Sequence, residues 1–312
     1  MDHKLYLSDK GIFKKGSSYY YFKNNKKITD QNIIDRLNSY VVPPAWTNVW
    51  YASNKKCHII LYGTDISGKK QYILSDKWIN TSRAEKFNRM KLFIKDMPSF
   101  KKKIKISNYN EILNKNLLIK LLFNLLIDLH IRVGNEKYAK QNNTYGLTTL
   151  KQKHLSFNGK NYILSFVGKS NIFHTIDIPC IYNHMIKQLI ITNKNKPLFY
   201  YTVNDKLTKI NSEELNIYLK KHMGSNYTCK DFRTWSANIL FIKHFLKNCK
   251  NKDNPKKIII DSINYSANQL GHSKNICKKS YISNNLLDYC LDSFNIASNL
   301  LPSELLVKIW SL

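Results

Sequence analysis

The sequence predicts an α+β protein in which a small β-rich N-terminal domain precedes a larger, mainly helical domain. The chain has 312 residues, of which 43% are hydrophobic, so it is long enough to bury a sizeable core and to form two domains. Short runs of aromatic and β-branched residues, separated by polar turns, dominate the N-terminal part. From about residue 83 the apolar residues recur with a helical period. We therefore predict domains over residues 1–82 and 83–312.

The N-terminal domain is expected to contain four strands, at 17–22, 49–52, 57–62 and 71–74. A short helix beginning at Thr29-Asp30 separates the first two and ends before Pro43-Pro44, because proline cannot continue a helix. The change from strand to helix patterning at Trp78–Arg83 indicates a linker. The basic stretch Lys69-Lys70-Gln71-Tyr72 follows a turn, and it is either an ordinary exposed hairpin or a DNA-reading element. In the second case Gln71 would pair with adenine, although these residues alone favour the exposed hairpin.

The helical domain is expected to begin with helices at 84–93 and 116–133. Arg132 would be the last polar residue of the second helix, where it would either compensate the helix dipole or reach a ligand. A small β-hairpin or sheet is predicted at about 146–178, with a type I′ turn at Asn158-Gly159. The next turn carries Lys169 at its tip.

Three further helices are predicted from their end signals. Thr228 and Asp231 form a capping box for a helix that carries Arg233 near its N-terminus, where the helix dipole does not favour a cation. A helix over 258–270 ends at Gly271, and Ser273 caps a following helix, so His272 lies in the turn between them. That last helix would carry Tyr281, and residues 286–309 would form one or two more.

The charge of the chain indicates a polyanionic partner. Fifty Lys and Arg residues stand against 21 Asp and Glu, which gives a net charge of +29. Codon bias toward Lys, Asn and Ile is one alternative explanation, and an anionic membrane surface is another. A membrane-binding protein would carry a basic amphipathic helix with a wide apolar face, and no such helix stands out in the sequence. The apolar run 117–133 is interrupted by polar residues and predicts a buried helix rather than a membrane span.

The remaining composition sets the expected environment. Six cysteines at 57, 180, 229, 249, 277 and 290 form no CxxC pair, which is typical of free thiols in a reducing, intracellular compartment. The N-terminal Met-Asp-His-Lys lacks the apolar stretch of a signal peptide. No metal-ligand spacing and no glycine-rich phosphate loop are apparent, so neither a metal nor another cofactor is expected.

Five residues in chain order carry a possible chemistry: Arg132, Lys169, Arg233, His272 and Tyr281. A tyrosine hydroxyl surrounded by cations is a possible nucleophile, although a single tyrosine on an amphipathic helix is more often simply packed. Preorganised cations stabilise the negative charge that a phosphodiester gathers in its transition state, and arginine suits phosphate because it binds bidentately. A lysine can donate the proton that an alkoxide leaving group needs.

The stretches around these residues resemble the poxvirus-type (small viral and bacterial-like) type IB DNA topoisomerases, and the resemblance spans nearly the whole chain. The helical domain carries it in Ile131-Arg132-Val133-Gly134 with Lys137-Tyr138, Tyr145-Gly146-Leu147-Thr148-Thr149-Leu150-Lys151, Phe166-Val167-Gly168-Lys169, Lys230-Asp231-Phe232-Arg233-Thr234, and Leu270-Gly271-His272-Ser273 through Tyr281. The N-terminal domain adds Pro43-Pro44-Ala45-Trp46-Thr47-Asn48-Val49-Trp50 and Gly68-Lys69-Lys70-Gln71-Tyr72.

The resemblance implies a catalytic domain shared with tyrosine recombinases, the DNA breaking-rejoining fold, which closes with the N-terminal domain as a clamp on double-stranded DNA. It implies that Tyr281 attacks a phosphodiester to give a 3′-phosphotyrosyl bond, while Arg132, Arg233 and His272 bind the phosphate oxygens and Lys169 acts as general acid. The enzyme would relax supercoils as a monomer, without ATP, metal or protein partner. DNA contacts carry over to Lys70, Gln71, Tyr72, Lys137 and Tyr138.

Two departures and two alternatives remain open. Leu74 and Asn135 differ from residues found in some members of the family, which puts the cleavage sequence in doubt. A tyrosine recombinase would use much the same five roles, but Lys230 stands where recombinases usually have histidine. A non-catalytic basic DNA-binding protein is the third interpretation. A viral origin, with a place in the virion and host cytoplasm, would follow from the resemblance only.

Overall fold

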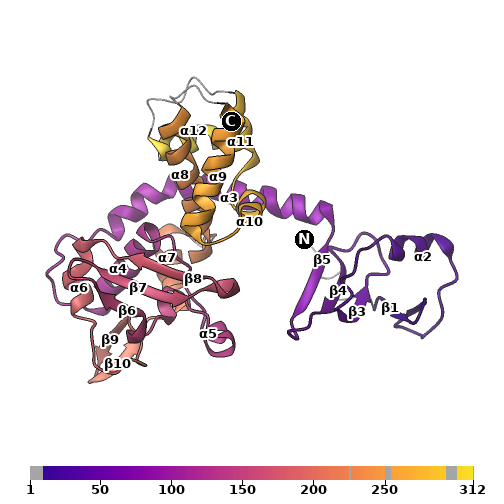
Figure 1. The fold of residues 1–312 in the computed structure, drawn as a ribbon, viewed down its shortest axis with the longest axis horizontal. Coiled ribbons are helices and arrows are strands. Elements are labelled where there is room, and N and C mark those ends of the chain that lie inside the picture. The colour runs from indigo at the N-terminus through magenta and orange to yellow at the C-terminus, as the bar shows by residue number, and fades with distance from the viewer. Residues whose placement is uncertain (1–9, 225, 250–253, 293–300, 312) are drawn as a thin grey trace. The chain divides into compact units, whose positions relative to one another are not determined.

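A computed structural model describes residues 10–224, 226–249, 254–292 and 301–311. The chain forms two compact units, residues 1–86 and 87–312 (Figure 1), which are described separately below. The boundary lies within the helix α3 (Asp76–Lys103). The expected linker at Trp78–Arg83 is therefore wrong, because these residues form the first turns of α3. The hydroxyl of Ser75 accepts the N–H of Trp78 there, as an N-cap does.

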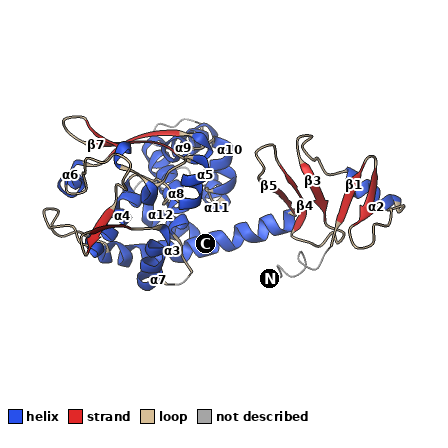
Figure 2. Cartoon of the chain, turned by 90° about the horizontal axis from the view of Figure 1, so that it is seen from below, coloured by secondary structure: helices blue, strands red, loops and turns tan. Residues whose placement is uncertain are grey.

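The N-terminal unit is an antiparallel five-stranded sheet in the order β2-β1-β3-β4-β5 (Figure 2). Its strands are β1 (Ile12–Lys15), β2 (Ser18–Tyr21), β3 (Thr47–Tyr51), β4 (Ile59–Thr64) and β5 (Lys70–Leu74). The last four correspond to the predicted strands, whereas β1 was not predicted. The helix α2 (Gln31–Asn38) begins as predicted at Asp30, whose carboxylate accepts two backbone N–H groups. Leu37 of α2 packs with Ile12 in the core of this unit.

The C-terminal unit is built around α8 (Cys229–Asn248), in which every residue from 231 to 242 is buried. Its neighbours are α4 (Lys115–Asp128), α7 (Ser212–Met223), α9 (Pro255–Leu270) and α12 (Pro302–Ser311). Phe232 of α8 packs edge-on against Phe93, with ring centroids 5.2 Å apart. The predicted capping box is confirmed, since Thr228 and Asp231 pair reciprocally at the start of α8.

The other helices of this unit are shorter: α5 (Glu136–Asn142), α6 (Asn183–Lys187), α10 (Lys274–Ser280) and α11 (Asn284–Asp292). Together α11 and α12 confirm the expectation of one or two helices near the C-terminus. Within the described ranges, no helix combines the length and apolarity that crossing a bilayer requires.

A three-stranded antiparallel sheet β6-β7-β8 lies in the predicted β-segment. It consists of β6 (Leu155–Phe157), β7 (Tyr162–Val167) and β8 (Phe173–Asp177). The loop between β6 and β7 has four residues, since Phe157 pairs with Tyr162, so the predicted two-residue type I′ turn is wrong. The Asn158 side chain accepts two backbone N–H groups of this longer loop. A separate hairpin, β9 (Tyr200–Val203) with β10 (Lys206–Lys209), was not predicted.

The helix α4 ends earlier than the sequence predicts. It closes at Asp128 with Leu129 as C-cap, and His130 has a left-handed backbone with φ of 53°. Arg132 therefore lies in an extended segment after the helix and not on its last turn. This ending releases the carbonyl of His130 from the helix, so that it is available to a distant partner.

Candidate active site

Arg233 is the most buried of the five candidate residues, with 6% of its surface exposed. Its Nη1 donates to the carbonyl of His130 at 2.7 Å, and its Nη2 donates to the carbonyl of Leu270 at 2.6 Å. One guanidinium thus ties the segment after α4 to the C-terminal end of α9. Its buried Nε has no hydrogen-bond partner among the described residues. That donor is available to a bound anion.

The electrostatics around Arg233 favour an anion. Burial and the like charge of Arg132 lower the pKa of Arg233 to about 10, while the Tyr281 phenol acts in the opposite direction. The guanidinium stays charged at neutral pH. Two neighbouring guanidinium groups in a buried setting repel each other, so a phosphate bound between them would be strongly stabilised.

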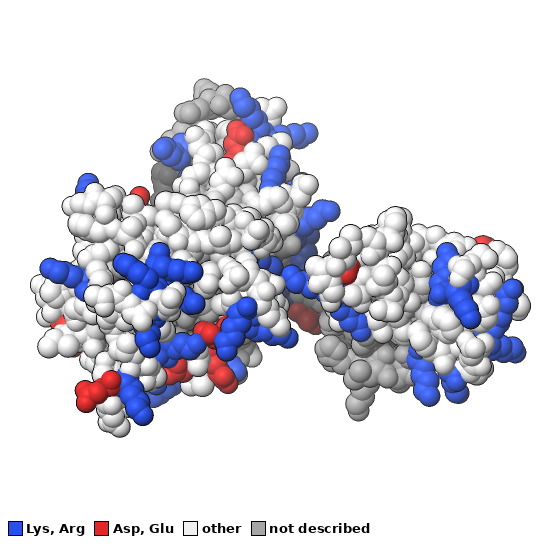
Figure 3. All heavy atoms as spheres, turned by 60° about the horizontal axis from the view of Figure 1, so that its bottom comes forward, with Lys and Arg blue, Asp and Glu red and all other residues white. Residues whose placement is uncertain are grey.

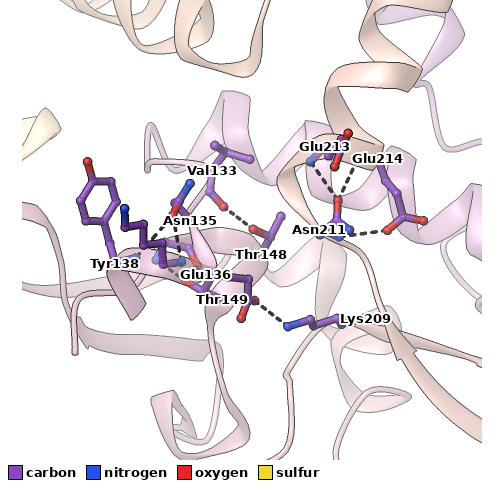
Figure 4. Close-up of polar contacts among 12 residues, drawn as sticks. Val133, Asn135, Glu136, Tyr138, Thr148, Thr149, Lys209, Asn211, Glu213 and Glu214 are labelled. Carbon is purple, nitrogen blue, oxygen red and sulfur yellow. Dashed lines mark hydrogen bonds and ion pairs between the residues drawn. The ribbon is translucent and has the colours of Figure 1, made fainter. Parts of the chain in front are cut away.

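Arg132 is held by backbone hydrogen bonds to a loop that follows α5. Its carbonyl accepts the N–H of Leu147 at 2.8 Å, and the carbonyl of Val133 accepts both the N–H and the hydroxyl of Thr148 (Figure 4). The Arg132 side chain forms no hydrogen bond or ion pair within the described part of the chain. Its guanidinium lines a small pocket together with Lys169 and Arg233. The structure therefore brings three predicted cations to one pocket.

Lys169 is exposed at the turn between β7 and β8, as predicted. The turn is tight: Ser170 and Asn171 both have positive φ angles, of 63° and 61°. The N–H of Gly168 donates to the carbonyl of Ile172 at 2.7 Å and closes it. Lys169 also lines the pocket, and its ammonium has no acidic partner among the described residues.

His272 lies in the predicted turn between α9 and α10. Gly271 ends α9 in a left-handed conformation with φ of 60°, and the N–H of His272 donates back to the carbonyl of Ala267. Ser273 caps α10 as predicted, by accepting the N–H of Ile276. Tyr281 lies at the C-cap of α10, one residue past the helix in which it was predicted.

The rings of His272 and Tyr281 stack, and the Tyr281 ring also faces Arg233. The imidazole and phenol centroids are 4.7 Å apart with an angle of 11° between the planes. The Cζ atom of Arg233 lies 6.0 Å from the centroid of the Tyr281 ring. The candidate nucleophile Tyr281 thus forms one contiguous group with His272 and Arg233 in the C-terminal unit. The guanidinium is within cation–π distance of the ring.

His272 is neutral at physiological pH. Burial, and then the charge of Arg233, lower its pKa to about 4. Both ring nitrogens are buried without a hydrogen-bond partner among the described residues. A neutral imidazole has one N–H donor, so this ring can give one hydrogen bond to an incoming oxygen.

Lys137 and Tyr138 lie on the short helix α5 and are exposed, which leaves both free to contact a partner. Asn135 is the N-cap of this helix, and its side chain accepts the N–H groups of both residues (Figure 4). An ion pair of 2.8 Å between Lys209 and Glu136 ties the same helix to β10. The structure places these two residues on a different element from Arg233 and Tyr281.

The three candidate residues of the N-terminal unit lie at the start of β5. Lys70 covers the Tyr62 ring at 3.3 Å, and Tyr72 is 48% exposed. The Gln71 amide donates to Asp65 at 2.8 Å. Hydrogen bonds from Ser67 and Gln71 lower the pKa of Asp65 to about 2, so this carboxylate is ionised at neutral pH. One N–H of the Gln71 amide is thus engaged by Asp65.

In Figure 3, Lys and Arg side chains are scattered over the drawn face of each unit and are more widespread than Asp and Glu, although other residues form most of the surface. This distribution agrees with the 50 basic and 21 acidic residues of the chain. A surface of this charge attracts a polyphosphate chain over a wide area.

Two residues at the site were not predicted. Asn238 of α8 is fully buried, and its amide donates to the carbonyl of Tyr281 at 2.9 Å. His174 of β8 lines the pocket that also contains Arg132 and Lys169. A signal for His174 was present, because it takes an apolar position in the alternation Ile172, His174, Ile176. No local signal distinguishes Asn238 within its apolar helix.

Fold and pocket together define a strongly basic protein of two units, with a cationic pocket whose Arg233 also lies against a tyrosine ring. The family model described as the catalytic core of eukaryotic DNA topoisomerase I matches residues 75–293, and that described as the N-terminal domain of bacterial DNA topoisomerase IB matches residues 18–65. DNA topoisomerase 1B of Acanthamoeba polyphaga mimivirus is 36% identical over 293 residues, covering 89% of this chain and 87% of the relative. DNA topoisomerase I of monkeypox virus is 28% identical over 303 residues, covering 87% and 90%.

The chain therefore belongs to the type IB DNA topoisomerases, a class of isomerases. The family, and the fold class expected from the sequence, are confirmed. The match to a topoisomerase core along most of the chain favours this assignment over a tyrosine recombinase. It likewise disfavours a non-catalytic DNA-binding protein.

Proposed function

We propose that the protein relaxes supercoiled duplex DNA by cutting one strand transiently and rejoining it. The observation that carries the proposal is the group formed by Tyr281, His272 and Arg233, in which a phenol lies against a histidine and a buried guanidinium. Arg132 and Lys169 line the pocket that Arg233 shares. The membership of the family supports DNA as the substrate.

In the cleavage step, the Tyr281 phenol gives up its proton to water and its oxygen bonds to a backbone phosphorus, while the bond from phosphorus to the 5′-oxygen breaks. The products are a phosphotyrosyl bond to the 3′ end and a free 5′-hydroxyl. Arg132 and Arg233 bind the non-bridging oxygens, because preorganised guanidinium groups stabilise the charge that gathers there. The neutral His272 adds a hydrogen bond to one of these oxygens.

Lys169 is the proposed general acid. The departing 5′-oxygen would be an alkoxide, and an ammonium on an exposed turn can reach it and donate a proton. Rejoining reverses each step: the 5′-hydroxyl returns its proton to the Lys169 amine and attacks phosphorus, and the Tyr281 oxygen leaves and regains a proton from water. One phosphodiester is exchanged for another, so the bond energy is conserved and the reaction needs neither ATP nor a metal ion.

The remaining basic residues hold the duplex. Lys70, Gln71 and Tyr72 are proposed to contact DNA from the N-terminal unit, and Lys137 and Tyr138 from α5. Lysines contact phosphates, while Gln71 is suited to adenine in the major groove. The cut strand rotates between cleavage and rejoining, and a monomer that surrounds the duplex keeps hold of both sides of the cut.

Plasmid relaxation tests the proposal. Wild-type protein, incubated with supercoiled plasmid in EDTA and without ATP, is expected to produce relaxed topoisomers. Tyr281→Phe, which removes only the hydroxyl, is expected to bind the plasmid and leave it supercoiled. Relaxation by the phenylalanine variant would contradict the assignment of Tyr281. Activity only on plasmids that carry paired recombination sites would contradict topoisomerase activity and support recombination.

A further inference from the structure

His174 occupies the space between the two turns that carry Lys169 and His272. It pairs with Phe166 across β7 and β8, and the two rings stack with centroids 5.1 Å apart. Paired residues on neighbouring strands lie on the same face of the sheet, so His174 shares a face with Phe166. Gly168, two residues after Phe166 and just past β7, lies on that side too. The imidazole thus lies over the end of β7, next to the turn of Lys169.

Two glycines contact this ring from different elements. A Cβ atom at Gly168 would lie 2.6 Å from Nε2 of His174, and a Cβ atom at Gly271 would lie 2.4 Å from its Cε1. Real Cβ atoms do not approach that closely, so both backbones touch the ring only because neither residue has a side chain. Gly168 directly precedes Lys169, and Gly271 directly precedes His272.

The surroundings of His174 favour the neutral form of its ring. Burial lowers its pKa, and the nearby charges of Arg233 and Arg132 lower it further. The ring lines the same pocket as both arginines. A neutral, flat ring adds no repulsion to this cationic site and can fill a narrow gap between two backbones.

We propose that His174 is a positioning residue for the reaction: its ring is the spacer that sets the separation between the Lys169 turn and the His272 turn. The inference rests on the proposed function, since the separation matters only if both residues act on one phosphate. His174 acts through the two turns, by contact with Gly168 and Gly271. Misplacement of a catalytic group by about 1 Å can cost about 10²-fold in rate.

The first test compares two variants of His174 by the rate at which covalent protein–DNA adduct forms on plasmid, with enzyme in excess. His174→Ala empties the gap and is expected to slow adduct formation by about 10- to 100-fold, with unchanged DNA affinity. His174→Phe keeps a ring of similar breadth and is expected to stay within about threefold of wild type. If His174→Phe is as slow as His174→Ala, a ring nitrogen is needed and the spacer role is wrong.

The second test uses Gly168, whose backbone is compatible with alanine because its φ is −94°. Gly168→Ala introduces a methyl group against the His174 ring and is expected to slow adduct formation about tenfold or more. When His174 is already replaced by alanine, Gly168→Ala is expected to slow adduct formation no further, because the ring with which its methyl group clashes is absent. Additive effects would overturn the proposal, since the two residues would then act independently.

A matched control and a stability measurement separate positioning from folding. His222 of α7 also packs on an aromatic ring, Tyr218, with centroids 4.3 Å apart. His222→Ala is expected to form adduct at the wild-type rate. The urea midpoint of each variant reports unfolding, and His174→Phe tests the spacer even if His174→Ala fails to fold. If wild type itself forms no adduct, the proposed function fails; if it does and the His174 variants match it, only this inference fails.

Discussion

The imidazole of His272 lies flat on the phenol of Tyr281, with centroids 4.7 Å apart and planes 11° apart. The two residues come from different elements, the turn after α9 and the end of α10. Stacking of this kind fixes both rings in one orientation before any substrate binds. The two rings are preorganised to that extent. The position of the Tyr281 hydroxyl also depends on what holds the backbone of Tyr281.

Asn238 holds that backbone, so Asn238→Ala is expected to slow covalent adduct formation. The amide donates to the Tyr281 carbonyl at 2.9 Å and accepts the N–H of Ser283 at 3.2 Å. Removing it leaves a buried acceptor and donor unpaired, which costs about 1–3 kcal/mol of stability for each group. We expect adduct formation to slow about tenfold or more at unchanged DNA affinity.

Asn124 of α4 provides the matched control for this variant. Its amide donates to two backbone carbonyls, those of Ile104 and Lys120, and neither belongs to the segment of Tyr281. Asn124→Ala is expected to lose stability in urea unfolding without a selective loss of adduct formation. Equal rate losses in the two variants would mean that Asn238 has no particular role at Tyr281.

Arg233→Lys is expected to abolish most cleavage although it preserves the charge. Lysine lacks the fork with which Arg233 reaches the carbonyls of His130 and Leu270 at once. We expect a loss of about 10²-fold in the rate of adduct formation, as when one transition-state donor is removed. Single-turnover adduct formation and urea unfolding measure the two effects separately.

Arg36 of α2 is the corresponding control, because it also donates to two backbone carbonyls, those of Ala52 and Ser53. Arg36→Lys is expected to keep the wild-type rate of adduct formation. A wild-type rate for Arg233→Lys would show that charge alone suffices at that position.

Acid should destabilise the protein in part through His154. Its pKa is lowered by burial from 6.5 to about 4, so between these values the unfolded chain binds more protons than the folded one. The stability from His154 is complete above pH 6.5 and is lost as the pH falls toward 4. His154→Asn keeps an acceptor for the N–H of Lys151 but does not titrate. Between pH 7 and pH 5 the free energy of unfolding of this variant should fall by about 2 kcal/mol less than that of wild type, as measured by urea unfolding.

Gln71→Ala is expected to change where the enzyme cuts and not how fast it cuts overall. Gln71 lies on β5 and its amide donates to Asp65 in the free protein, and glutamine is suited to the base contact proposed for it. Cleavage positions mapped on a sequenced duplex should become less selective, by about 1–3 kcal/mol at an adenine. Gln31→Ala, which breaks a similar contact to Asp35, should leave the pattern unchanged. An unchanged pattern for Gln71→Ala would leave this residue without a role in base recognition.

The sequence predicts those parts of the fold that local chemistry specifies. The capping box at Thr228 and the helix stop at Gly271 are side-chain and backbone preferences of single turns, and both are confirmed. The predicted end of α4 at residue 133 was wrong, because the true end depends on a tertiary contact. The carbonyl of His130 pairs with Arg233, which is 103 positions away in the chain.

The same distinction applies to the site. The five chemistry-bearing residues could be chosen from the sequence because their types and order match a reaction. Asn238 and His174 could not, since each acts on elements far away in the chain and neither carries the chemistry itself. Hydrogen bonds and ring contacts across the fold decide such roles. The alternation of Ile172, His174 and Ile176 marks His174 as an inward-facing position, but it does not reveal the contact with Gly271.

The most direct test of the account is to identify the amino acid to which DNA becomes attached. Wild-type protein trapped with denaturant on plasmid, then digested with nuclease and protease, is expected to give a nucleotide-bearing peptide with the modification on Tyr281. The linkage should join the phenol oxygen to a 3′-phosphate. Attachment through any other side chain, or a 5′-phosphate linkage at Tyr281, would contradict the proposed mechanism.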